Sequence, residues 1–203
     1  MKKYAVLHEP GDIVTLAGTR FVVLDVERRG SLPDSLFLLA LESVGASEFG
    51  SSNNYAESDL KKAVDKWLED MGKRGLDNAK LIPREIDLTT LDGSGCYGKL
   101  SVKAAPLTLD EAREYADIIP NAERWCWLAT GWSGPSKSDG DLALYVNSNG
   151  DWNVDYCSGS GGIRPALKAP SILFEDSEAG LDLSKIPTDD LLQEIHRRLA
   201  EKA

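Results

Sequence analysis

The residue types best suited to binding a ligand gather between positions 139 and 156. Residues 147–153, NSNGDWN, combine amide and carboxylate groups with one indole ring. Such side chains supply adaptable hydrogen bonds around a rigid aromatic anchor. The dipeptide Asn149-Gly150 between two apolar runs also predicts a β-hairpin with a type I′ turn, which needs positive φ at both positions. The two interpretations are compatible, because a rigid hairpin can carry a binding face.

The same region offers hard oxygen atoms of the kind that calcium prefers. They belong to Asp139, Asp141, Asn147, Asn149, Asp151, Asn153 and Asp155. The regular spacing of an EF-hand loop is missing, so turn chemistry explains most of these residues. We therefore expect no cofactor, with calcium kept as the alternative.

Three tryptophans precede this region, at Trp125, Trp127 and Trp132. Trp125 and Trp127 are two residues apart, so a strand would direct both to the same side. They could stack on a sugar or a peptide, or they could form a packed core. Burial is the commoner use of aromatic side chains, and the sequence leaves the choice open.

Catalytic chemistry has little support in the sequence. The three cysteines, Cys96, Cys126 and Cys157, form neither a disulfide framework nor a metal-binding motif. The two histidines, His8 and His196, lack the spacing of zinc ligands. The P-loop motif G-x-x-x-x-G-K-[ST] and the G-x-S-x-G serine motif are absent as well. We therefore predict no catalytic residues and favour a binding protein over an enzyme, a choice that the sequence leaves open.

The 203 residues include 23 basic and 33 acidic side chains, a formal net charge of −10. This charge argues against a nucleic-acid partner and against binding to anionic lipid. The longest apolar run, at 35–41, is far shorter than the roughly 20 residues needed to cross a bilayer. The first residues also lack the apolar core of a secretory signal. We expect a soluble protein, cytoplasmic or carried on a virion, with no membrane insertion.

Periodicity predicts the elements of the first half of the chain. Short β-branched and aromatic runs predict strands at 13–16, 21–26 and 36–41. Apolar residues at helical spacing predict a helix over 58–71. Residues 78–97 are weakly patterned and are expected to be irregular.

The second half begins with a capping box, Thr108 to Glu111, which predicts a helix that Pro120 stops. Strands are then expected at 125–129, 142–146, 152–156 and 163–167. Residues 175–184 are expected to form an acidic linker, and Thr188 to begin a last helix. The predicted division is a domain at 1–174 and a linker with a C-terminal helix at 175–203.

Three stretches of the chain resemble a known bacterial and phage family, the domain of unknown function 6273. They are GDIV…FVVLD within 11–25, YAESDL…WL within 55–68, and WCWL…ALYVN…G…GIRPAL within 125–167. The final GIRPAL and the preceding W-x-W-L are the most specific parts of the resemblance. The C-terminal helix lies outside it.

The resemblance implies an α+β fold of C-type-lectin-like type, similar to the formylglycine-generating, sulfatase-activating domains. Short twisted antiparallel strands, two packed helices and a C-terminal helical extension are expected. The fold also resembles variable receptor-binding proteins of phages, which implies ligand-binding positions at Tyr145, Asn147, Asn149, Trp152, Asn153, Asp155 and Tyr156. Formylglycine-generating enzymes need a cysteine pair near the C-terminal motif, whereas Cys157 stands alone there.

The resulting functional prediction is a non-enzymatic ligand-binding protein, associated with a phage or prophage. Its 145–156 hairpin is expected to contact a glycan or protein on a cell surface. One alternative is a structural protein that forms homo-oligomers through its last helix. Another is a divergent enzyme of the sulfatase-modifying type.

Overall fold

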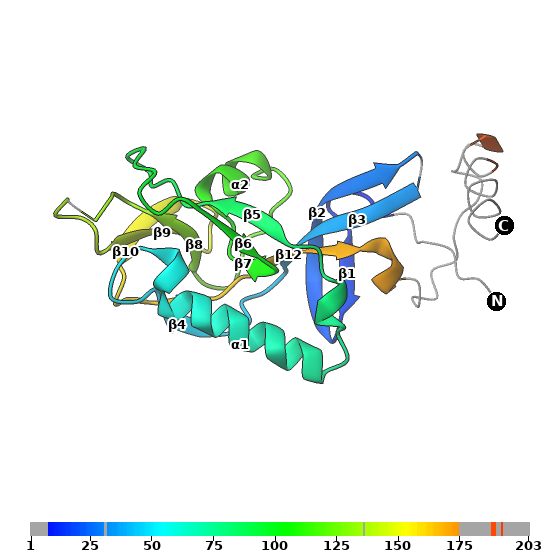
Figure 1. Cartoon of the computed structure of the whole chain (residues 1–203), viewed down its shortest axis with the longest axis horizontal. Helices are drawn as coiled ribbons and strands as arrows, with labels where there is room; N and C mark the ends of the chain where they lie inside the picture. The colour runs from blue at the N-terminus through cyan, green and yellow to red at the C-terminus, as the bar shows by residue number, and fades with distance from the viewer. Residues whose placement is uncertain (1–7, 31, 136, 175–187, 190–191, 193–203) are drawn as a thin grey trace.

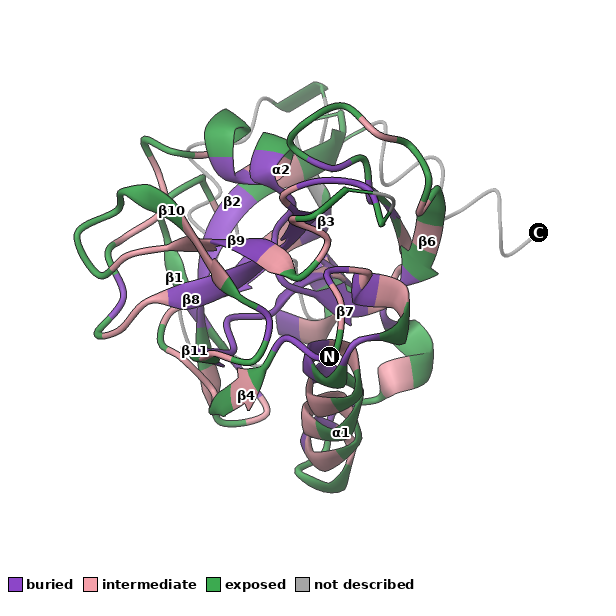
Figure 2. Cartoon of the chain, turned by 90° about the vertical axis from the view of Figure 1, so that its left-hand side faces the viewer, coloured by how far each residue is buried: buried purple, intermediate pink, exposed green. Residues whose placement is uncertain are grey.

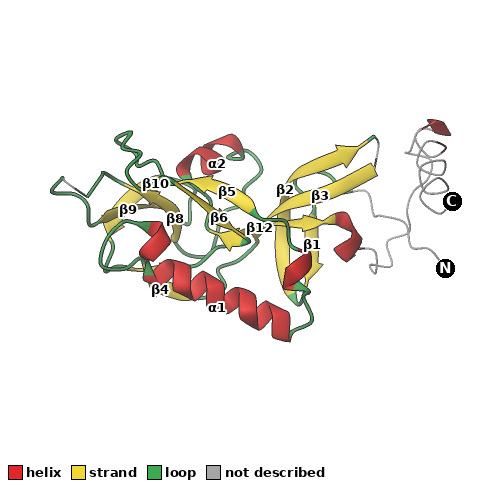
Figure 3. Cartoon of the chain, viewed as in Figure 1, coloured by secondary structure: helices red, strands yellow, loops and turns green. Residues whose placement is uncertain are grey.

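The computed structural model describes residues 8–30, 32–135 and 137–174, together with residues 188, 189 and 192. Within these residues the fold is α+β: two five-stranded sheets, a two-stranded ribbon and two α-helices (Figures 1 and 3). The predicted class is therefore confirmed. The predicted linker and last helix lie almost wholly outside the described residues.

The first sheet joins the two ends of the described chain. Its order is β1 (Ile13–Leu16), β2 (Thr19–Arg29), β3 (Leu32–Ala40), β12 (Ala166–Pro170) and β7 (Ala104–Ala105). All of its pairings are antiparallel, and Leu39 pairs with Ala166. Four consecutive residues of β2, Phe21 to Leu24, are buried, so this strand is covered on both faces.

The second sheet carries the predicted hairpin. Its order is β10 (Trp152–Tyr156), β9 (Leu142–Val146), β8 (Cys126–Gly131), β11 (Ser160–Gly162) and β4 (Ala46–Glu48). The β8–β11 pair is parallel, whereas the other pairs are antiparallel. Every residue of β8 is buried, and this strand lies at the centre of the sheet (Figure 2).

Two helices cover the sheets from opposite sides, α1 below and α2 above in Figure 1. α1 (Asp59–Lys73) begins at the N-cap Ser58, whose side chain accepts a hydrogen bond from Lys61 N. α2 (Leu109–Glu114) begins with the predicted capping box between Thr108 and Glu111. Short 3₁₀ helices occupy Tyr55–Glu57, Asn78–Lys80 and Ser171–Phe174.

Both sheets contribute to two apolar clusters. The α1 side holds Leu60, Val64 and Met71 of the helix with Phe21 and Trp127 of the strands. The α2 side collects the side chains that face the other way: Val22, Leu24, Leu39, Leu109, Ala112, Leu128 and Leu144. Alternation along β2 and β8 therefore assigns neighbouring residues to different halves of the core.

The chain crosses from the second sheet to the first at residues 163–165. Ile163 N donates to Gly45 O over 2.9 Å, and Ala40 N donates to Pro165 O over 2.9 Å. The predicted strand at 163–167 is therefore wrong in its bounds, because the segment separates β11 from β12. Pro165 has no N–H to donate, which suits a position where the ladder is interrupted.

Two further expectations need correction. Residues 78–97 are not wholly irregular, because β5 (Arg84–Asp87) pairs with β6 (Lys99–Val102). Only Ile86 of β5 is buried, so the strand carries little apolar pattern. The helix after Thr108 also ends at Glu114, well before Pro120. No helix of the described residues is long and apolar enough to cross a membrane.

Candidate functional site

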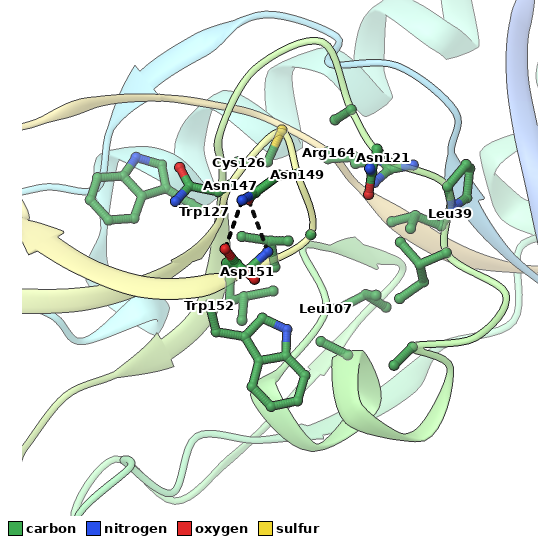
Figure 4. A pocket seen from close by; sticks show the side chains of 18 residues that line it. Leu39, Leu107, Asn121, Cys126, Trp127, Asn147, Asn149, Asp151, Trp152 and Arg164 are labelled. Atoms are coloured by element: carbon green, nitrogen blue, oxygen red, sulfur yellow. Dashed lines mark hydrogen bonds between the residues drawn. The ribbon is translucent and has the colours of Figure 1, made fainter.

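A cavity of about 320 Å³ lies between the hairpin and the α2 side of the second sheet. We call it the α2–hairpin cavity (Figure 4). Its walls come from α2 and the segment that follows it, from β8 and β9, and from the loop of the hairpin. The size lies at the lower end of the range for small-molecule sites.

One wall of the cavity is a row of side chains across three strands. Trp152 of β10 pairs with Val146 of β9, and Val146 pairs with Cys126 of β8. All three residues line the cavity. Adjacent strands lie about 4.8 Å apart, so the row is about 10 Å long.

The hairpin loop closes one side of the cavity. Asn147 N donates to Asp151 O over 2.8 Å, and Gly150 N donates to Asn147 O over 3.0 Å. Among these loop residues only Gly150 has a positive φ, at +90°. The hairpin is thus confirmed but the type I′ turn is wrong: three residues form the loop, with glycine at its left-handed position.

Side chains hold this loop in shape and against its neighbour. Asn149 Nδ2 donates to Asp151 Oδ2 over 2.7 Å, and Asp151 N donates to Asn149 Oδ1 over 3.2 Å (Figure 4). A Cβ atom on Gly150 would lie 3.1 Å from Asn121 Oδ1, so the loop and the segment after α2 meet there. The rim is therefore preorganised in part by its own hydrogen bonds.

α2 supports the aromatic side of the cavity. The guanidinium carbon of Arg113 lies 5.4 Å from the centroid of the Trp152 ring, which is within the range of a cation–π contact. Arg113 Nη1 also donates to Asp110 Oδ1 over 3.2 Å. Trp152 is 43% exposed, so its indole is held in place while part of it faces solvent.

Arg164 lines the cavity near Cys126. It is 7% exposed, and its Nε and Nη2 donate to Ala40 O and Leu41 O over 2.8 and 3.1 Å. Burial lowers the pKa of its guanidinium, which nevertheless stays charged at any ordinary pH. A permanent positive charge therefore borders a cavity whose other walls are apolar or carry amide groups, apart from the carboxylate of Asp151.

The structure places the seven resemblance-derived positions in different surroundings. Asn147, Asn149 and Trp152 line the α2–hairpin cavity. Tyr145 and Asn153 pair with each other on the opposite face, where the Tyr145 ring lies 4.7 Å from that of Trp125. Alternation along β10 places the half-buried Asp155 on the same face as Asn153, whereas Tyr156 is 61% exposed and lies away from the cavity. The hairpin therefore does not bring all seven side chains to one surface.

Trp125 and Trp127 do lie on one side, as their spacing predicts. Their ring centroids are 4.9 Å apart in an edge-to-face arrangement. Trp127 is 1% exposed and its Nε1 donates to Ser47 O over 3.0 Å, so this ring belongs to the core. Trp125 and Trp132 are half-buried.

Two of the three cysteines are poorly placed for nucleophilic chemistry. Burial raises the pKa of Cys126 to about 11 and that of Cys157 to about 12, which disfavours both thiolates. Cys96 is exposed. In the part of the chain that the structure describes, no three His, Cys, Asp or Glu side chains gather in a way that could hold a metal ion.

Sequence reasoning missed most of the residues that line the cavity, among them the polar residues Asn121 and Arg164. Asn121 carries no signal in the sequence, because it becomes part of the rim only through its approach to Gly150. Arg164 does carry one: it is the single charged residue in the otherwise apolar 162–167 segment. A charge in a strand-like apolar run indicates a specific local partner.

No protein-family model matches the chain, and comparisons with curated proteins and with solved structures find no match either.

Proposed function

We propose that this protein is a non-enzymatic binding protein that holds a small ligand, or one terminal group of a larger one, in the α2–hairpin cavity. The observation that carries the proposal is the position of Trp152. The partly exposed indole of Trp152 is in cation–π contact with Arg113 and lines the cavity. Apolar walls and amide groups at the rim surround the same space. Such a combination is typical of ligand sites.

The larger ligand of this proposal is a glycan or a protein on a cell surface. The protein that binds it is proposed to be associated with a phage or encoded by a prophage. Support for that part comes from the resemblance of the 125–167 segment to a bacterial and phage family. The C-type-lectin-like fold belongs to the same proposal and has the same support. The proposed contact is narrower than the whole hairpin, because only three of the seven candidate residues line the cavity.

The test uses fluorescent full-length protein with intact bacterial cells and a glycan panel, with and without calcium. Trp152→Ala removes the indole at the cavity, and Tyr156→Ala removes an aromatic ring from the same strand outside it. We expect saturable binding that Trp152→Ala weakens at least about tenfold, as for an aromatic anchor, and that Tyr156→Ala leaves nearly unchanged.

Equal losses in both variants would point to the outer surface of β10 and contradict the cavity as the site. Absence of binding to every cell and glycan would remove the surface-receptor part of the proposal. Both variants change exposed side chains, and their far-UV circular dichroism and thermal unfolding should match those of the wild type.

A further inference from the structure

Arg164 is a buried cation whose charge has no close counterpart. None of the ion pairs within 4 Å among the described residues includes it. Its side chain donates hydrogen bonds to two neutral carbonyl oxygens, those of Ala40 and Leu41. Arg84 provides a contrast within the same chain, because its equally buried side chain does pair with the carboxylate of Glu111. Buried charges are normally paired in this second way.

Two acidic residues act electrostatically on Arg164, but neither of them lines the cavity. Glu42 and Glu123 act on it from a distance, and both are exposed. These two carboxyls also interact with each other, which raises the pKa of Glu42. Asp151 lines the cavity, but its carboxylate accepts a hydrogen bond from Asn149 in the hairpin loop.

The position of Arg164 fixes which end of the cavity is positive. Gly162, two residues earlier, pairs with Cys126, and Arg164 lines the cavity together with the same cysteine. Figure 4 shows Arg164 beside Asn121 and Cys126, on the side away from Trp152. The row from Cys126 to Trp152 is about 10 Å long, and Val146 lies at its middle. Leu107, Ile119 and Leu128 make the neighbouring walls apolar.

We propose that the α2–hairpin cavity selects a small carboxylate whose acid group pairs with Arg164 and whose ring lies along Val146 toward Trp152. This inference rests on the proposed function and names the chemical class of its ligand. A planar guanidinium pairs well with a carboxylate. The same group could belong to a free aryl carboxylate or to a sugar acid at the end of a glycan, and the test separates these sources.

The test compares three probes that share one ring and differ in charge. They are 3-phenylpropionate, 3-phenylpropionamide and 3-phenylpropylamine, titrated into the full-length protein at pH 7 with calorimetry and tryptophan fluorescence as readouts. We expect the acid to bind about tenfold more tightly than the amide, the gain of a charge-assisted hydrogen bond, and the amine to bind more weakly still. A second pair, methyl glucuronide and methyl glucoside, tests the sugar acid in the same way.

Variants of Arg164 and Trp152 test whether the preference for the acid over the amide comes from the charge of Arg164. Arg164→Gln should bring the ratio of acid to amide affinity close to one, whereas Arg164→Lys should keep part of the preference. Trp152→Ala should weaken the acid and the amide by the same factor and leave their ratio unchanged. If Arg164→Gln fails to fold, the wild-type ratios and Arg164→Lys still decide the matter.

The outcomes separate this inference from the proposed function. If the acid and the amide bind equally and Trp152→Ala weakens both, the cavity is a binding site and the carboxylate inference is wrong. A preference for the amine also overturns it and would make Asp151 the selective group. Failure of all the probes overturns the inference, and the proposed function then depends on the cell and glycan experiment alone.

Discussion

Gly161 lies against the ring of Trp125 so closely that a Cβ atom on it would come within 2.3 Å of Trp125 Cζ3. The same atom would lie 2.6 Å from Trp127 Nε1. Because Trp127 is fixed in the core, the two rings cannot both move away.

Gly161→Ala should therefore lower the free energy of unfolding by about 2 kcal/mol, as overpacking of a dense core does. Urea denaturation measures the change. Gly95→Ala is the control, because a Cβ atom there meets nothing within 4 Å, and it should alter stability by less than about 0.5 kcal/mol. Equal effects of the two substitutions would show that the tryptophan pair can relax.

Asn53 ties three segments together from a buried position. Its Nδ2 donates to Ser133 O and Leu142 O, each over 2.9 Å, and its Oδ1 accepts a hydrogen bond of 2.6 Å from the Tyr97 hydroxyl. Asn53→Ala should cost about 3 kcal/mol of unfolding free energy, because three hydrogen bonds are lost and the buried Ser133 carbonyl loses its donor, although Leu142 O keeps a second donor in Trp132 N.

Tyr97→Phe removes only one of these bonds and should cost about 1 kcal/mol. When Tyr97→Phe is added to Asn53→Ala, it should have little further effect, since the hydrogen bond that it removes is already gone. Strictly additive losses in a double-mutant cycle would contradict a direct hydrogen bond between the two side chains.

Asp92 is held by a lysine on a neighbouring loop. The hydrogen bond from Lys137 Nζ, 2.5 Å from Asp92 Oδ2, and a second one from the Thr90 hydroxyl lower the pKa of Asp92 to about 2. Since this value lies below that of the unfolded chain, about 3.9, the ionised carboxylate stabilises the fold above pH 4. That contribution should disappear as the pH falls through 2.

Carboxyl NMR titration should therefore give a midpoint near 2 for Asp92, and Lys137→Met should move it toward 4. The stability difference between wild type and Asp92→Asn should shrink between pH 4 and pH 2. An unchanged midpoint in the lysine variant would assign the shift to Thr90 and the loop backbone instead.

The three thiols should differ in reactivity. Cys96 is exposed and should react with a disulfide reagent in the native protein, whereas the buried thiols with raised pKa values, Cys126 and Cys157, should react only after unfolding. A count of thiols in native and denatured protein measures this, and Cys96→Ser should abolish the native reaction. Fast native reaction of a buried cysteine would favour the sulfatase-modifying alternative.

The elements with strong local signals could be predicted closely. β1, β9 and β10 have the predicted bounds, and α1 begins one residue later and ends two residues later than the predicted helix. The helix was predictable because Leu60, Val64 and Met71 form an apolar stripe behind the Ser58 cap. These signals reside in the residues of the element itself.

The cavity could not be predicted, because it depends on pairing rather than on periodicity. Its row joins Cys126, Val146 and Trp152 from three strands, and its charge comes from Arg164 on the crossing between the sheets. Periodicity also does not locate a crossing between sheets, so it predicts a strand at 163–167, where the structure has a crossing at 163–165 and then the start of β12. The small β5–β6 ribbon could not be predicted either, because Ile86 is the only buried residue of β5 and the strand therefore shows little apolar alternation.

β12 lies between β3 and β7 in the first sheet although it is the last strand of the described chain. During synthesis, the edge of β3 that carries Leu38 and Leu39 therefore stays without its pairing strand until residues 166–170 have been made. A ribosome-bound chain that has not reached Pro170 presents this edge to the surrounding proteins. Until residues 166–170 are made, this unpaired edge is a site at which the growing chain can aggregate.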